Sequence, residues 1–257
     1  GCSVKTSSQS IIIRPMRRSN SIAERPVDKS VEKVDNLPSP RRVLGVFAKE
    51  PVQGEVKTRL SPPLTAEQAA ELYQIALGET VAEMRQGPFD LVICYAGGED
   101  YFRNTFSDVP LYQQHGKNLG VRMANALQHF FRQSYQQAVL IGSDSPDLPL
   151  GLVAQAFAAL EHHSLALAPA HDGGYALIGE TCHHPQLFVD MPWSSPELLE
   201  TTRQRATAAG IDYQLLPPWD DLDDVAALRR FLQRSPATRT AAYLRSLAVA
   251  EGLSAQP

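Results

Sequence analysis

The sequence predicts an α/β fold built on a mostly parallel central sheet. From residue 42 onward, short apolar segments typical of buried strands alternate with longer segments whose apolar residues recur at helical spacing. The chain of 257 residues can bury a substantial core, and its 43% hydrophobic content is ordinary for a globular protein. No internal repeat and no break in composition divides this region. We therefore expect a single domain over residues 41–257, with helices flanking the sheet.

Four strands and two helices are expected in the first half of this domain. Thr65 and Gln68 match the two ends of a capping box, which predicts a helix from there to about Arg85. Apolar residues at helical spacing predict a second helix over 119–131. Fully apolar or β-rich runs predict strands over 43–47, 89–95, 110–114 and 138–141.

The second half continues the alternation. A helix is expected over 150–160, followed by a strand over 165–168. The sequence Asp172-Gly173-Gly174 is typical of a tight hairpin turn and leads into another strand, over 175–179. The remaining expected elements are a helix over 196–209, a strand over 213–216 and two closing helices over 223–233 and 237–249.

Residues 1–40 differ in composition and are expected to form a mostly disordered tail. They are rich in Ser, Arg and Pro, and they carry seven Lys or Arg residues against four acids. Up to residue 23 there is no acid, a composition that resembles an organelle transit peptide. The alternative is an extension without function. Because this tail holds +3 of a whole-chain charge of −4, the rest of the chain carries −7.

Composition also limits the partners and the compartment. An acidic domain argues against nucleic acid as the main ligand, because such binding rests on a broad basic face. No run approaches the roughly 18 apolar residues that span a bilayer, so no membrane span is expected. The three cysteines are far apart and form no CxxC pair, which indicates a reducing compartment. We expect a cytoplasmic protein, or an imported one if the tail is a transit peptide.

The most informative segment is the loop that follows the first expected strand. It gathers Lys49, Gly54, Lys57, Thr58 and Arg59. Open α/β sheets bind ligands at the carboxyl ends of their strands. Lysine and arginine neutralise phosphate oxygens there, while glycine lets backbone N–H groups approach closely. The loop therefore predicts a phosphate-binding site, and the alternative is a solvated basic loop.

Carboxylates that follow later strands are candidate metal ligands. Asp144 comes directly after the strand expected over 138–141, where a rigidly held carboxylate can coordinate Mg²⁺ or Mn²⁺. Asp221 and Asp223 belong to a run of four acids whose mutual repulsion a bound cation would relieve. We expect these three residues to bind the metal. The alternatives are ordinary helix caps and acids that complement a helix dipole.

The turn after the strand expected over 165–168 carries two candidates for proton transfer. His171 or Asp172 could deprotonate the hydroxyl of an acceptor. Gly173 and Gly174 would let the backbone approach a bound nucleotide or its phosphates. The alternative is a turn without a chemical role, which Asp-Gly-Gly alone would explain.

Four motifs, taken in order, resemble those of a known family. They are FAKEPVQGEVKTRL at residues 47–60, GSDSP at 142–146, DGGYALIG at 172–179 and DLD at 221–223. The set resembles the GT-A-type glycosyltransferase-like family often labelled radical-SAM/selenodomain-associated transferase. That family is a sister group of nucleotidyltransferases such as the molybdenum-cofactor and phospholactate guanylyltransferases. The resemblance spans about Arg42 to Leu232.

The resemblance implies a single Rossmann-like GT-A domain with a nucleotide pocket over the strand ends. It also implies a metal held around Asp144, with the acidic loop nearby. One position departs from the family pattern, because Asn118 stands before Leu119-Gly120 where the family usually has Asp. This departure puts only that polar contact in doubt.

These observations lead to the hypothesis of a Mg²⁺- or Mn²⁺-dependent transferase with a nucleotide-activated donor, a sugar nucleotide first, and a small-molecule acceptor. Gly54 and neighbouring amides would bind the diphosphate, with Lys57 and Arg59 neutralising it and Lys49 at its edge. Two alternatives stay open. One is a nucleotidyltransferase that releases pyrophosphate, and the other is a nucleotide-binding module without catalysis.

Overall fold

The computed structural model describes residues 40–234 and 237–251, with side chains as far as residue 247. Apart from Pro40, the predicted disordered tail lies outside the described residues, so the boundary of the domain stays a prediction. No helix in these ranges is both long enough and apolar enough to cross a membrane.

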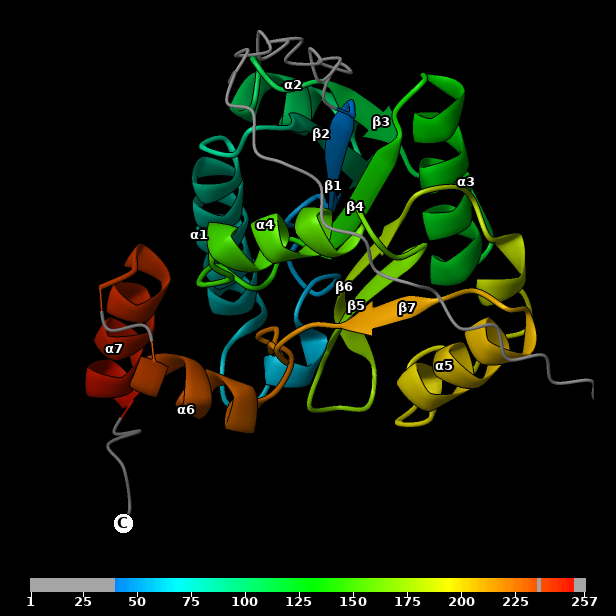
Figure 1. The fold of residues 1–257 in the computed structure, drawn as a ribbon. Helices are drawn as coiled ribbons and strands as arrows, with labels where there is room; N and C mark the ends of the chain where they lie inside the picture. The colour runs from blue at the N-terminus through cyan, green and yellow to red at the C-terminus, as the bar shows by residue number, and fades with distance from the viewer. Residues whose placement is uncertain (1–39, 235–236, 252–257) are drawn as a thin grey trace, which may run out of the picture. The chain divides into compact units, whose positions relative to one another are not determined.

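A seven-stranded sheet lies at the centre of the domain (Figure 1). Its strand order is β3-β2-β1-β4-β6-β5-β7, and all pairs are parallel except those that β6 makes with β4 and β5. The predicted α/β class with a mostly parallel sheet is therefore confirmed. The strands are β1 Arg42–Lys49, β2 Asp90–Ala96, β3 Leu111–Gln113, β4 Gln137–Gly142, β5 Leu165–Pro169, β6 Tyr175–Glu180 and β7 Tyr213–Leu215.

Helices cover both faces of the sheet (Figure 1). On one face, α3 and α5 pack against strand residues, with Leu127 and Phe130 beside Leu140. On the other face, α4 packs through Phe157 and the end of α1 through Met84. The helices are α1 Ala66–Met84, α2 Glu99–Thr105, α3 Leu119–Arg132, α4 Leu150–Ala159, α5 Leu198–Ala208, α6 Val225–Arg234 and α7 Arg239–Glu251, with short 3-10 helices η1 Thr58–Leu60 and η2 Pro185–Leu187.

The last two helices pack against the start of α1. Phe231 of α6 and Leu244 of α7 share a buried apolar cluster with Leu72 of α1 and Leu60 of η1. Leu222, in the acidic loop before α6, is buried in the same cluster. This packing fixes the position of the acidic loop next to the segment that follows β1.

The expected elements agree closely with those observed, except for α2. The capping box of α1 is formed, because Gln68 N donates to Thr65 Oγ1 at 3.1 Å and Thr65 N donates to Gln68 Oε1 at 2.7 Å. The helix α2 is not predicted from the sequence, because its seven residues are too few to establish a helical period. The local signal for this helix is the pair of acids in its first turn, Glu99 and Asp100.

The pairing of β1 with β4 brings two loops together. Phe47 pairs with Gly142 across these parallel strands, so both loops leave the same edge of the sheet. The loop after β1 carries the basic residues, and the loop after β4 carries Asp144. The topology thus brings the predicted phosphate-binding loop and Asp144 to one edge of the sheet.

Candidate active site

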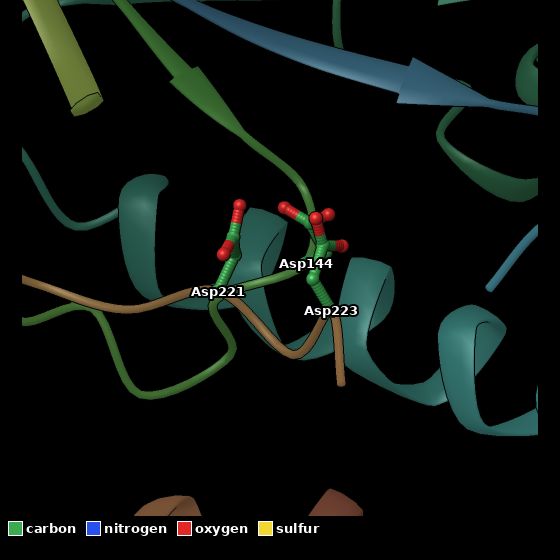
Figure 2. A group of neighbouring side chains, drawn as sticks. All are labelled: Asp144, Asp221 and Asp223. Atoms are coloured by element: carbon green, nitrogen blue, oxygen red, sulfur yellow. The ribbon is translucent and has the colours of Figure 1, made fainter. Parts of the chain in front are cut away.

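Three carboxylates meet beyond the carboxyl end of β4. Asp144, Asp221 and Asp223 each offer a carboxylate oxygen, and these oxygens lie within 4.8 Å of one another. Figure 2 shows the side chains converging, with Asp144 at the end of β4 and the other two on the loop before α6. A hydrogen bond of 3.0 Å from Leu222 N to the Asp144 carbonyl joins the two loops. The predicted metal ligands are therefore neighbours in space, and they form what we call the carboxylate cluster.

Lys57 lies among these carboxylates. Its Nζ donates to Asp144 Oδ2 at 2.7 Å and to Asp223 Oδ1 at 2.8 Å, and only 6% of its side chain is exposed. Burial alone would lower the pKa of this ammonium, but Asp144 and Asp223 outweigh burial and raise it above its usual value. The backbone of Lys57 has a φ of 49°, which is uncommon for a residue with a side chain. The chain thus adopts a strained conformation that brings an ammonium to the cluster.

The cluster holds more negative charge than Lys57 offsets. Burial and the charges of Asp144 and Asp223 raise the pKa of Asp221 to about 7. Burial also disfavours ionisation of Asp223, but Lys57 prevails and lowers the pKa of that carboxyl. A further cation at the cluster is therefore electrostatically favourable.

The donor set fits Mg²⁺ or Mn²⁺. Both are hard cations that prefer carboxylate oxygens and retain several waters. Three carboxylate oxygens within 4.8 Å of one another could fill part of one coordination shell and leave positions for water and phosphate. Because Lys57 contacts Asp144 and Asp223, a cation would compete with its ammonium for these carboxylates.

A hollow of about 590 Å³ opens next to the cluster, and we call it the main hollow. The loop after β1 lines one part of it, and Asn118 and Arg122 at the start of α3 line another. Residues of the sheet edge and Ser194 complete its walls. Seven predicted site residues belong to this lining: Lys49, Lys57, Thr58, Arg59, Asp144, Asp221 and Asp223.

The other predicted site residues do not line the main hollow. Gly54 is exposed in the loop after β1, where its φ of 78° suits a turn. Gly173 packs against the Pro196 carbonyl so closely that a Cβ would overlap it. Gly174 N donates to Asp172 Oδ1 at 2.9 Å. These glycines shape and pack their turn, and their contact with a nucleotide stays a prediction.

His171 belongs to a polar network that includes a buried carboxylate. Its Nδ1 lies 2.5 Å from Asp220 Oδ1, and Asp220 Oδ2 accepts from Arg230 Nε at 2.7 Å. Burial opposes ionisation of Asp220, but Arg230 and His171 lower its pKa. Asp172 follows His171 in the same turn and is exposed. An imidazole held at one nitrogen by a carboxylate is the usual arrangement of a general base.

Two residues that hold the site in place are not predicted from the sequence. The Tyr73 hydroxyl of α1 accepts from Lys49 N at 2.9 Å and lies 2.6 Å from Ser143 Oγ, so it ties the ends of β1 and β4 together. Asp220 was seen as one of four acids but not as the partner of His171. No local pattern marks either residue, because each acts through a partner distant in sequence.

Asn118, which departs from the family pattern, has a structural role. Asn118 Oδ1 accepts from Val121 N at 2.9 Å and caps α3. Asparagine and aspartate serve equally well at this position of a helix. Asn118 therefore caps α3 as an aspartate there could.

Comparisons with known proteins place these features in a family context. The family described as "Uncharacterized protein conserved in bacteria (DUF2064)" matches residues 79–195. No curated protein matches the chain in sequence. Among solved structures, the "putative nucleotide-diphospho-sugar transferase" of Desulfovibrio desulfuricans G20 is 32% identical, with a TM-score of 0.76 over 81% of this chain and 95% of that one.

Two more distant structures share the fold. A nucleotidyl transferase from Methanothermobacter thermautotrophicus is 11% identical, with a TM-score of 0.52 over 80% of this chain and 99% of that one. A cytidylyltransferase from Leptospira borgpetersenii serovar Hardjo-bovis (strain JB197) is 10% identical, with a TM-score of 0.50 over 83% and 96%. At such identities the likeness concerns the fold alone. The resemblance to a GT-A-like fold related to nucleotidyltransferases is confirmed.

Proposed function

Since this chain belongs to the DUF2064 family, we propose that it is a transferase that uses a divalent metal and a nucleotide-activated donor. The name of its D. desulfuricans relative supports a sugar nucleotide as the donor. The observation that carries the proposal is the carboxylate cluster in the lining of the main hollow, in contact with a basic loop. Glycosyl transfer to a small acceptor is the reaction that we place first.

The diphosphate of the donor would bind between the cluster and the loop after β1. Arg59 is exposed there, with Nη1 3.8 Å from Asp223 Oδ2, and Lys49 is exposed in the same lining. Thr58 and the N–H groups near Gly54 would donate further hydrogen bonds. The Lys57 ammonium would turn to the phosphates once a metal takes over its carboxylate partners.

Asp144, Asp221 and Asp223 would hold the metal ion. When bound, Mg²⁺ or Mn²⁺ supplies positive charge that stabilises the diphosphate leaving group. The protein's own contribution is to bind and orient the donor through the basic loop, and to hold the leaving oxygens in a polar, partly enclosed site.

His171 is the first candidate for the general base, and Asp172 is the second. Asp220 holds His171 Nδ1, so Nε2 would accept the proton of the attacking hydroxyl. Asp172 is exposed beside it and already accepts one hydrogen bond, from Gly174 N. Gly173 and Gly174 are left out of the phosphate site, because they pack into their own turn.

Nucleotidyl transfer is the second candidate function. The same carboxylates and cations suit attack on an α-phosphorus, with pyrophosphate as the leaving group. A module that binds nucleotides without catalysis is the alternative outside enzymes.

Binding is tested by thermal shift of the full chain with sugar nucleotides and nucleoside triphosphates, in the presence and absence of Mn²⁺. A ligand of the native state raises its apparent stability, so we expect an increase in Tm that needs the metal. Absence of a shift with every nucleotide would overturn the proposal. A shift that EDTA leaves unchanged, with no donor turned over, would identify a binding module.

Product analysis then decides between the two reactions. Release of a nucleoside diphosphate from a sugar nucleotide is expected for glycosyl transfer. Release of pyrophosphate from a nucleoside triphosphate would instead establish nucleotidyl transfer.

A further inference from the structure

A second, smaller hollow lies beside the main hollow, and its lining is almost entirely apolar. Its volume is about 130 Å³, and its walls include Met123 and Trp193. The two hollows share Phe47, Leu119 and Gly142. We call it the apolar hollow.

Two of the shared residues define how the hollows connect. Gly142 stands two residues before Asp144, and a side chain at this glycine would meet the Asp144 carboxylate. The apolar lining therefore begins where the carboxylate cluster ends. Leu119 lies at the same boundary and is 49% exposed.

Tyr175 and Trp193 are the lining residues that carry a polar side-chain group. The Tyr175 hydroxyl is buried, has almost no accessible surface and has no hydrogen-bond partner among residues 40–234 and 237–251, so it does not face the hollow. The hollow therefore offers its occupant few hydrogen bonds and suits an apolar group.

The wall formed by Trp193 is held rigidly. Its ring fits over Gly120 of α3, where any Cβ would overlap it, and it stacks on Phe188 with the planes 16° apart. The next residue, Ser194, has a φ of 63° and lines the main hollow. Non-glycine residues with strained backbone conformations tend to occur at ligand sites. Ser194 and Trp193 are adjacent in the chain, so they connect the walls of the two hollows.

We propose that the acceptor of the transferase carries a compact apolar group that binds in the apolar hollow, an inference that rests on the proposed function. A cavity of roughly 150 Å³ with apolar walls accepts benzene, so about 130 Å³ suits a six-membered ring or a branched five-carbon chain. The acceptor's reacting hydroxyl would then lie past Gly142, beside the carboxylate cluster.

The donor is a poor occupant of this hollow. A nucleobase has several polar atoms on its edge, and a sugar has several hydroxyls, whereas the side chains of the lining carry two polar groups, the indole N–H of Trp193 and the inaccessible hydroxyl of Tyr175. Most of the donor's polar atoms would lose their hydrogen bonds to water without replacement. The donor therefore belongs in the main hollow, which has the cations and the larger volume.

The test uses 4-fluorophenol and fluorobenzene as probes, followed by ¹⁹F NMR titration of the full chain. Both are expected to bind at one site with similar affinity. A probe that is excluded from the hollow keeps its apolar surface in water, so Ala176→Leu, which fills the hollow, should weaken both probes about tenfold or more. Tyr175→Phe should leave both affinities unchanged, because the hydroxyl does not face the hollow.

Two further variants make these results decisive. Tyr101→Phe removes a hydroxyl from α2, outside both hollows, and should leave both affinities unchanged. If thermal melting shows that Ala176→Leu is unfolded, Leu119→Ala takes its place, because a half-exposed leucine can be truncated without loss of the fold. It should weaken both probes severalfold.

A competition experiment separates an acceptor site from a donor site. With Mn²⁺ and a sugar nucleotide bound, 4-fluorophenol should still bind. Displacement of the probe by the nucleotide, or no probe binding where the nucleotide still raises Tm, would overturn the inference and leave the proposed function intact. Probe binding that follows the variants, without any nucleotide binding, would instead remove the proposed function and leave the apolar site.

Discussion

The ammonium of Lys57 lies 2.7 Å from the carboxylate of Asp144, although the two residues are 87 positions apart in the sequence. A second contact of 2.8 Å, to Asp223, makes Lys57 a counter-ion within the carboxylate cluster. A divalent cation would bind the same carboxylates. We therefore expect metal binding to weaken the contacts of the lysine, and the following predictions test this expectation and the rest of the site.

Replacement of Lys57 by methionine should make the protein depend on metal for its stability. Without metal, three neighbouring carboxylates would lose their counter-ion, and unfolding should become easier by about 1–3 kcal/mol. Added Mn²⁺ should bind more tightly than to the wild type, because the competing ammonium is gone. Thermal melts at several Mn²⁺ concentrations measure both effects. Lys117→Met removes an exposed lysine and is the control; equal responses of the two variants to Mn²⁺ would contradict the prediction.

Replacement of Asp223 by asparagine should weaken metal binding without damage to the helix that follows. The cluster loses one charged ligand, so the increase in Tm on addition of Mn²⁺ should be smaller. Asp224→Asn is a matched control on the same loop. Asp224 Oδ1 accepts from Ala227 N at 2.7 Å, and asparagine can keep this bond at the start of α6. The metal site would have to lie elsewhere if both variants kept the full shift.

Replacement of His171 by glutamine should lower kcat with little change in stability. A general base contributes about 10²–10⁴-fold to a rate, and the side chain of His171 is 59% exposed. The assay follows turnover of the donor identified by product analysis. His163→Gln is the control, since His163 Nδ1 also pairs with a carboxylate, Asp212 Oδ2, at 3.2 Å, away from the cluster. Unchanged turnover by His171→Gln would remove this histidine from the mechanism.

Glu180 should make the fold less stable as the pH rises. Burial raises the pKa of its carboxyl, and the pairing with His183 offsets burial only in part. The folded state thus holds this proton more tightly than the unfolded chain does. The stability that it contributes is complete below the unfolded pKa of about 4.3 and is lost as the pH rises through the higher folded value.

Substitution of Glu180 by glutamine should remove this pH dependence. Denaturant unfolding from pH 4 upward would follow it, with Glu83→Gln, a residue at the end of α1 that is not fully buried, as the control. Equal slopes for wild type and Glu180→Gln would show that the carboxyl does not titrate differently on folding.

Local signals explain why most of the fold is predictable from the sequence. The Thr65 and Gln68 pair caps its own helix, and the apolar run of β4 needs no partner to be identified as a buried strand. The helix α2 leaves too short a pattern to be identified, so its position follows from packing of Phe102 against the sheet edge. The sequence predicts the strands and helices that local signals define, but it does not predict α2, which depends on tertiary contacts.

For the candidate site, the sequence predicts which residues take part but not how they pair. The sequence places cations after one strand and acids after two others, and the parallel sheet brings them to one edge. It does not indicate that Lys57 pairs with Asp223, 166 positions away, or that Asp220 holds His171. Such pairs depend on how the loops pack against each other. The periodicity of the sequence does not predict that packing.

The sequence by itself therefore determined the order of strands and helices, the α/β class and the acids and cations at the strand ends. Periodicity, caps and turn residues involve positions close together in the chain, so they can be identified from the sequence. Only the tertiary structure decided which charges meet. It placed the Lys57 ammonium among the carboxylates of the cluster, and it opened an apolar hollow beside that cluster. Both outcomes depend on packing between segments that the chain separates by a hundred residues or so.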